Sequence, residues 1–361
     1  MTDSLTKLAF QTFQQGKNYL AIAHKMMSGQ IREWVAPRVE QKTQSLSPQA
    51  LQKFQKRVDK ILQRDWQDAE AGVYSTDLLF DGATETFWQY PLLCWELPQV
   101  WEKANRGSYR EFSPDIDTRG YPNYYLQNFH YQIDGYLSDR SAELYDLQVE
   151  ILFNGLGDTM RRRILAPLKQ EIEPLAANLR TPRDLRILDV ACGTGRMLKG
   201  LRSTFPQASL FGVDLSPAYL RKANQLLSSQ PGELPQLLQG NAEALPYRDG
   251  YFHAVTCVFL FHELPAPVRQ NVFNEMFRVL QPGGVAVICD SIQVEDDPDL
   301  KPAMENFQTL FHEPYYRDYI QDDLPAKLQT AGFVDVSTYS YFMSKYWVAR
   351  KEPATTTAAI A

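Results

Sequence analysis

The second half of the chain alternates short apolar runs with amphipathic or polar segments. The apolar runs are RILDVACG from Arg186, SLFGVDLS from Ser209, YFHAVTCVFLF from Tyr251 and GGVAVICDS from Gly283. Short apolar runs between helical segments are typical of parallel strands that are buried on both faces. The pattern predicts a doubly wound α/β sheet between about residues 184 and 350.

Two further strand-like runs lie near the end of the chain, GFVDVSTYS from Gly332 and MSKYWVARK from Met343. The link between them is too short for a parallel crossover, so the sequence predicts a closing antiparallel hairpin. The small and polar segment 351–361 that follows is predicted to be a disordered tail.

The first half of the chain has helical periodicity. Ser47-Pro48 is typical of an N-cap and the first helical residue, and apolar residues recur at helical spacing behind it as far as Trp66. A looser pattern with a few scattered basic residues runs from Leu5 to Trp34. We expect this helix to pack on its own protein; a helix that lies on a membrane surface is the alternative.

These patterns predict a helical N-terminal domain over residues 1–140 and connecting helices over 141–183. A break in the connecting helices is expected between Gly155 and Gly157. The basic triplet Arg161–Arg163 beside it fits either an anion site or, more commonly, a solvated helix face.

Composition excludes several classes of protein. The net charge of −6 argues against binding of nucleic acid through a broad basic face. The four cysteines stand far apart and without zinc spacing, which indicates reduced thiols and no metal site. The N-terminus does not read as a signal peptide, and the longest apolar run is far shorter than the ~20 residues of a membrane span. We therefore expect a soluble, cytoplasmic protein.

A glycine-rich turn and an acidic residue mark the ligand edge of the predicted sheet. Gly193 and Gly195 follow the first strand and let the backbone approach a ligand closely. Asp214 ends the second strand, where a carboxylate can accept hydrogen bonds from a ribose. A nicotinamide-binding fingerprint continues to a third glycine, but this chain continues with Arg196.

Four motifs in this order and spacing resemble the Rossmann-like S-adenosylmethionine-dependent methyltransferases. They are ILDVACGTGRML, GVDLSPAYLRKA, GNAEALPYRDGYFHAV and RVLQPGG. They look closest to the branch that includes quinone-biosynthesis and other small-molecule methyltransferases. The resemblance implies a seven-stranded, mostly parallel sheet with an antiparallel last strand, which agrees with the predicted hairpin.

The resemblance also implies which residues hold S-adenosylmethionine. The methionine part lies at Asp189, Ala191, Gly193 and Gly195, and the ribose at Asp214; Leu215, Asn241 and Ala242 contact the adenine, and the segment from Phe259 to His262 borders the reacting methyl group. The family usually has an acid where Asn241 stands, although an asparagine oxygen can also accept. His253 replaces a usual aspartate at a position that is more often structural.

Methyl transfer from a sulfonium needs alignment of the nucleophile and exclusion of water, and an oxygen nucleophile must also lose a proton. His262 is the candidate general base because it follows the fourth strand. The alternative is a histidine that hydrogen-bonds a backbone group. Without an NPPY or DPPY motif after that strand, a nucleic-acid substrate is disfavoured.

Two aromatic segments outside the predicted sheet are candidates for the acceptor pocket, 121–136 and 311–320. They offer flat apolar area with polar tips. We expect either a lid over a small-molecule acceptor or ordinary core between domains. The candidate acceptor-binding residues are Tyr125, His130, Tyr136, His312, Tyr315 and Tyr316.

Three rival functions remain open at this stage. A protein methyltransferase would present residues 121–136 as an exposed groove, and a non-enzymatic sensor would bind the cofactor without turnover. A nicotinamide oxidoreductase is disfavoured by the missing third glycine. The oligomeric state is not predicted.

Overall fold

A computed structural model describes residues 4–37, 44–45 and 47–354. The helical elements that precede the first strand are α1 (Ser4–Val35), α2 (Pro48–Glu70), η1 (Thr76–Phe80), α3 (Ala83–Arg106), η2 (Phe129–Tyr131), α4 (Asp139–Leu152), α5 (Gly157–Arg162), α6 (Leu165–Ala176) and η3 (Pro182–Asp184). The predicted break in the connecting helices is confirmed between α4 and α5. Most of the predicted tail lies outside the described residues.

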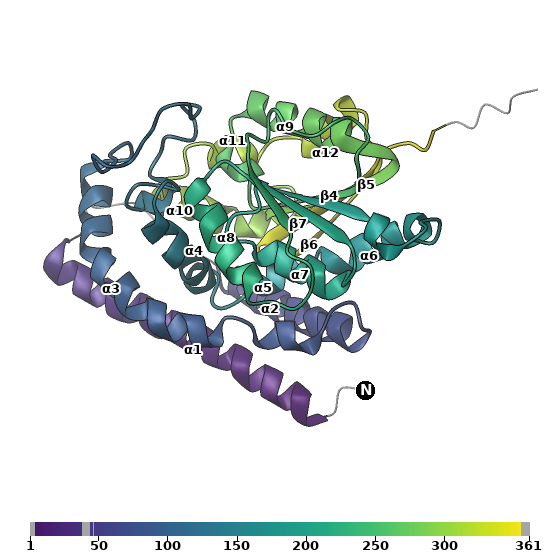
Figure 1. The fold of residues 1–361 in the computed structure, drawn as a ribbon. Helices are drawn as coiled ribbons and strands as arrows, with labels where there is room; N and C mark the ends of the chain where they lie inside the picture. Colours follow the sequence, from purple (N-terminus) through teal and green to yellow (C-terminus); the bar gives the residue numbers. More distant parts are fainter. Residues whose placement is uncertain (1–3, 38–43, 46, 355–361) are drawn as a thin grey trace, which may run out of the picture.

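The rest of the chain forms the sheet and the helices that cover it (Figure 1). Its elements are β1 (Arg186–Val190), α7 (Arg196–Thr204), β2 (Ser209–Asp214), α8 (Pro217–Ser228), β3 (Gln236–Gln239), β4 (Phe252–Val258), η4 (Phe261–Glu263), α9 (Ala266–Val279), β5 (Leu280–Ser291), η5 (Pro298–Leu300), α10 (Lys301–Leu310), α11 (Tyr316–Tyr319), α12 (Leu324–Thr330), β6 (Val334–Tyr341) and β7 (Ser344–Arg350).

The seven strands form one sheet in the order β3-β2-β1-β4-β5-β7-β6. The five strands from β3 to β5 pair in parallel, whereas β7 pairs antiparallel with both β5 and β6. The predicted α/β class, the closing hairpin and the antiparallel last strand are therefore confirmed. No apolar run pointed to β3, because this short edge strand is largely solvent-exposed and half polar.

Alternate residues of the strands supply two cores on opposite faces of the sheet. Leu188 and Val190 of β1 pack with α9 and α12 on one face. Ile187 of β1 packs with α6, α7 and α8 on the other. This burial on both faces explains why the strands read as continuous apolar runs in the sequence.

The predicted helix over residues 5–34 is α1, and it packs on its own protein. Phe10 and Ala21 are buried against the rest of the helical half, while α1 and α3 lie side by side on the outer surface (Figure 1). The outward face of α1 nevertheless carries large apolar side chains, of which Trp34 is 90% exposed. In the described part of the chain, no helix combines the length and hydropathy that a bilayer span requires.

The basic triplet contradicts both interpretations that the sequence offered. All three arginines are buried, and each pairs with carboxylates of the same chain. Arg162 donates to both oxygens of Asp65 on α2, at 3.0 and 2.6 Å, and Arg161 donates to Asp158 at 2.6 Å. The triplet is neither solvated nor free to bind an external anion, because it is paired with acids of α2, α4 and α5.

Candidate active site

The glycine-rich turn between β1 and α7 is held against the end of β2. Gly193 N–H donates to Asp214 Oδ2 at 2.9 Å, and the second oxygen of Asp214 accepts from Ser216 N–H at 2.8 Å. Gly195 has φ 84°, and a Cβ there would lie 3.1 Å from Ala223. Only glycine fits this close approach between the turn and α8.

The two acidic residues that were predicted to hold the cofactor lie at the carboxyl ends of neighbouring strands. Asp189 is buried and accepts from Thr256 Oγ1 at 2.7 Å. Burial raises the pKa of Asp189 to about 7 and that of Asp214 to about 6. Backbone N–H groups of Gly193, Leu215 and Ser216 occupy part of the acceptor capacity of Asp214, and the carboxylate can still accept from a ribose hydroxyl.

Two non-glycine residues at this edge adopt left-handed backbone conformations. They are Ala191 after β1, with φ 54°, and Phe259 after β4, with φ 58°. Such strain is uncommon and tends to concentrate at functional sites. The ring of Phe259 stacks on Phe153, with ring centroids 6.1 Å apart, so it packs toward the connecting helices.

The predicted adenine side is formed by the loops after β2 and β3. Leu215, Asn241 and Ala242 are partly exposed there. Asn241 Oδ1 accepts from the backbone N–H of Glu243 at 2.9 Å, and Gln239 Nε2 donates to Leu215 O at 3.2 Å. These bonds fix both loops beside Asp214.

The aromatic lid, which we define as Tyr121–Tyr136, lies on this edge of the sheet. Ser216 Oγ donates to the backbone oxygen of Tyr136 at 2.6 Å, and Tyr124 donates to Glu243 at 2.7 Å. Tyr125 and Tyr136 join one aromatic cluster with Tyr315 of the second segment. The lid is therefore partly buried core, and it contacts the loops that follow β2 and β3.

The other aromatic candidates are divided between two places. His312 Nε2 lies 2.9 Å from Gln127 Oε1 under the lid, and its ring stacks on Tyr109. Tyr316 instead faces β5, where its hydroxyl lies 2.8 Å from Ser291 Oγ. The structure therefore brings Tyr125, Tyr136, His312 and Tyr315 together and leaves Tyr316 beneath them.

His262, the candidate base, is buried and lies 2.6 Å from Asp290 Oδ1 through Nδ1. Burial alone would lower the pKa of His262, but the charge and hydrogen bond of Asp290 outweigh it and raise the pKa to about 10. The ring is then an imidazolium at neutral pH, which disfavours proton abstraction by His262.

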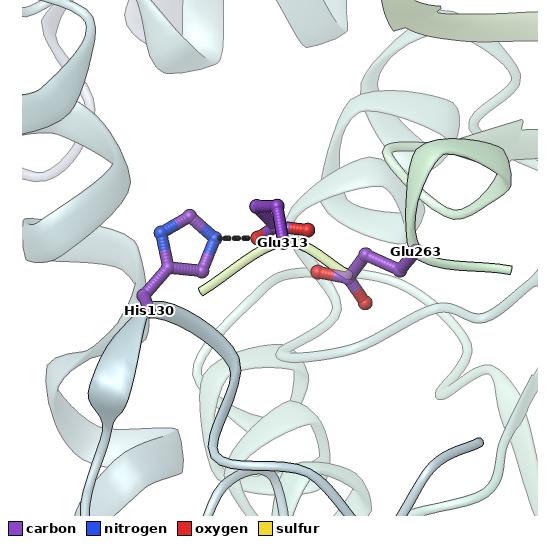
Figure 2. Close-up of side chains that lie close together, drawn as sticks. All are labelled: His130, Glu263 and Glu313. Atoms are coloured by element: carbon purple, nitrogen blue, oxygen red, sulfur yellow. Dashed lines mark ion pairs between the residues drawn. The ribbon is translucent and has the colours of Figure 1, made fainter. Parts of the chain in front are cut away.

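A second acidic group lies beside this pair. Figure 2 shows Glu263 and Glu313 pointing toward one another, with His130 on the far side of Glu313. His130 Nε2 is 2.6 Å from Glu313 Oε1, and Tyr136 donates to Glu263 at 2.5 Å. Burial and the neighbouring Glu313 raise the pKa of Glu263 to about 8.

Sequence reasoning did not assign Glu263, Glu313 or Asp290 to the site. One signal was available, because the tripeptide Phe-His-Glu occurs twice, at 261–263 and again at 311–313. The fold brings the two glutamates together from segments about fifty residues apart in the chain.

A cavity of about 680 Å³ lies elsewhere, on the outer side of the insertion that follows β5. Its lining includes Val294, Lys301 and Arg317. None of the residues predicted to bind cofactor or acceptor lines it, so it does not mark the candidate active site.

Known proteins share this domain. Residues 187–284 match a family model described as a methyltransferase domain. An uncharacterized methyltransferase of Synechocystis sp. is 30% identical over 166 residues, which are 45% of this chain and 74% of that protein. The chain belongs to the class I S-adenosylmethionine-dependent methyltransferases. The cofactor of this family is S-adenosylmethionine.

Relatives with named substrates cover different shares of this methyltransferase. A demethylmenaquinone methyltransferase of Deinococcus radiodurans is 37% identical over 149 residues, which are 41% of this chain and 56% of that protein. One of Lactiplantibacillus plantarum is 29% identical over 234 residues, which are 59% of this chain and 91% of that protein. The chain thus spans little more than half the length of the Deinococcus protein.

Proposed function

We propose that this methyltransferase transfers a methyl group from S-adenosylmethionine to a small, ring-containing or lipophilic acceptor. The observation that carries the proposal is the contact between Gly193 N–H and Asp214, which holds the glycine-rich turn against the end of β2 beside the aromatic lid. The demethylmenaquinone relatives support an acceptor of this class.

The chemistry required of the protein is mainly alignment and the exclusion of water. The acceptor atom forms a bond to the methyl carbon while the carbon–sulfur bond breaks, and S-adenosylhomocysteine leaves. An acceptor hydroxyl must also give up a proton. Glu313, whose buried carboxylate contacts His130 of the aromatic lid, is placed to take it.

Calorimetric titration with S-adenosylmethionine tests the cofactor site. We expect saturable binding by the wild type and roughly 10- to 100-fold weaker binding by Asp214→Ala, because a charge-assisted hydrogen bond to the ribose is lost. Asp249→Ala is the matched control, since that carboxylate is 80% exposed and precedes β4 at the opposite edge of the sheet.

A nicotinamide dinucleotide serves as the ligand control. Absence of S-adenosylmethionine binding, or preference for the dinucleotide, would overturn the proposed function. Equal weakening by Asp249→Ala would show that the Asp214 effect is not local. Melting curves of both variants establish that each is folded.

The acceptor class is tested by tracing a labelled methyl group in cells with and without the protein. We expect label in small, lipid-extractable molecules. Label confined to polypeptide would replace this acceptor class with a protein substrate docked on the helical half.

A further inference from the structure

We propose that His130, Glu263 and Glu313 form a binding site for a divalent transition-metal cation such as Mn²⁺, Fe²⁺ or Zn²⁺. The composition of the chain gave no sign of such a site, because cysteine and histidine are not clustered in the sequence. The site exists only where three distant segments meet, namely the aromatic lid, η4 after β4 and the loop before α11 (Figure 2).

The geometry of the three side chains suits an ion. One ligand atom from each lies within 4.8 Å of the other two. A cation with bonds of about 2.1 Å holds its ligand atoms roughly 3–4 Å apart. Small side-chain rotations therefore bring all three onto one cation, with His130 and Glu313 moving slightly apart from their 2.6 Å contact.

Glu313 gives an independent indication of a missing ligand. Its side chain has 0% exposure, and within the described part of the chain neither carboxylate oxygen accepts a hydrogen bond. The Glu313 carboxylate contacts His130 Nε2 at 2.6 Å as an ion pair. A buried carboxylate in this condition is costly unless a cation or a proton compensates it.

The charge balance of the surroundings points the same way. Three carboxylates, Glu263, Asp290 and Glu313, gather around the two imidazoles of His130 and His262. Asp290 is already paired with His262 at 2.6 Å. In the described part of the chain, His130 and the second ring nitrogen of His262, which is 4.0 Å from Glu263, face the two carboxylates of Glu263 and Glu313. A divalent cation supplies the charge that these two carboxylates lack.

The ligands are held by neighbouring groups, as ligands of metal sites usually are. Tyr136 donates to Glu263 at 2.5 Å. His130 has φ 53°, its N–H donates to His312 O at 3.3 Å, and its ring packs 5.5 Å from that of Phe311. Both side chains are thereby turned toward Glu313.

The ligand types select the class of metal. One imidazole with two carboxylates suits Mn²⁺, Fe²⁺ and Zn²⁺ better than Ca²⁺ or Mg²⁺, which prefer oxygen ligands alone. Three protein ligands also leave coordination positions open. The site therefore fits a cation that keeps water or a further ligand.

A bound cation would fix the aromatic lid to the sheet edge and to the insertion. The next step rests on the proposed function. An acceptor hydroxyl that enters an open coordination position of the cation would lose its proton to solvent or to a neighbouring base more readily than a free hydroxyl. The acceptor would then be a hydroxylated ring rather than an amine.

The test measures metal binding directly, without cofactor or acceptor. Full-length protein is stripped with a chelator, and Mn²⁺ is titrated while the free ion is followed by electron paramagnetic resonance. We expect one Mn²⁺ per chain, competition by Zn²⁺, and at least tenfold weaker binding in Glu313→Gln and in His130→Asn. Asparagine is chosen because it tolerates the left-handed backbone at position 130.

Glu305→Gln is the control, because it removes a carboxylate from the surface of the same insertion. Its Mn²⁺ affinity should equal that of the wild type. An imidazole nitrogen bound to Mn²⁺ modulates the electron spin-echo signal of the ion. This modulation should be present in the wild type and absent in His130→Asn. Weak binding of many ions, or affinity unchanged in both site variants, would overturn the proposal.

The two proposals fail separately. Binding of S-adenosylmethionine without Mn²⁺ binding would refute the metal site and leave the methyltransferase proposal intact. Mn²⁺ binding without S-adenosylmethionine binding would refute the proposed function and leave the metal site intact.

Discussion

The sheet half and the helical half of this protein bury different kinds of side chain. The central strands β1, β4 and β5 are buried along nearly their whole length by apolar residues. The helical half holds its own helices together partly through buried ion pairs such as Arg162–Asp65, and it leaves Trp34, Trp88 and Trp95 in contact with solvent.

This difference shows which parts of the protein stabilise the fold and which are available for contacts with other molecules. Apolar burial on both faces of a sheet is non-directional and tolerates only changes that keep volume. Buried paired charges hold one geometry, and removal of one partner leaves the other charge buried without compensation. Exposed apolar side chains contribute little to folding and remain available for contacts with other molecules.

The largest effect should come from the sheet half. Phe273 on α9 has 0% exposure and stacks on Phe261 with ring centroids 4.3 Å apart. We expect Phe273→Ala to lower the free energy of unfolding by about 3–5 kcal/mol, because it leaves a cavity. Denaturant titration measures this, and Phe273→Leu should cost clearly less. A loss below ~1 kcal/mol for the alanine would contradict the comparison.

The buried ion pairs of the helical half should have the next largest effect. Asp65→Ala leaves the buried Arg162 guanidinium without its carboxylate, although Leu78 O and Thr159 still accept from it. We expect a loss of about 3–4 kcal/mol in the free energy of unfolding. Asp59→Ala, on the exposed side of the same helix, is the control and should stay within ~0.5 kcal/mol. Equal effects of both variants would refute a special role of the ion pairs.

Asp189 makes the stability of the sheet edge depend on pH. Burial raises its pKa from 3.8 to about 7, so the folded state keeps a proton that the unfolded state releases. This contribution is complete below pH ~4 and is lost as the pH rises through about 7. We expect the stability of the wild type to fall by roughly 2–4 kcal/mol over that window relative to Asp189→Asn. Parallel pH profiles of the two proteins in cofactor-free buffer would argue against it.

The smallest effect on folding should come from the outer face of the helical half. Trp34 is 90% exposed, so Trp34→Ser should change the free energy of unfolding by no more than ~0.5 kcal/mol. The alternative that the sequence left open, contact of this helix with a membrane surface, is tested with the same variant. If that contact forms, co-sedimentation with lipid vesicles falls while the melting curve does not move; unchanged co-sedimentation would count against it.

Much of the fold could be predicted because its signals are local. Each central strand is a short apolar run, Ser47 and Ser216 cap the helices that follow them, and the short link between β6 and β7 permits only a hairpin. The exposed strand β3 and the proline-containing helix α3 gave no such signal. The two prolines inside α3 give it a low helix propensity, and packing of Leu93 against α4 stabilises the helix instead.

The sequence by itself determined the sheet, the glycine turn and the position of Asp214, because neighbouring residues dictate each of them. Only the tertiary structure decided that the aromatic lid covers that edge and that the arginine triplet is buried against acids of α2 and α5. It alone brought Glu263 and Glu313 together with His130. Contacts between segments far apart in the chain depend on how whole elements pack, and local sequence does not encode that packing in a readable form.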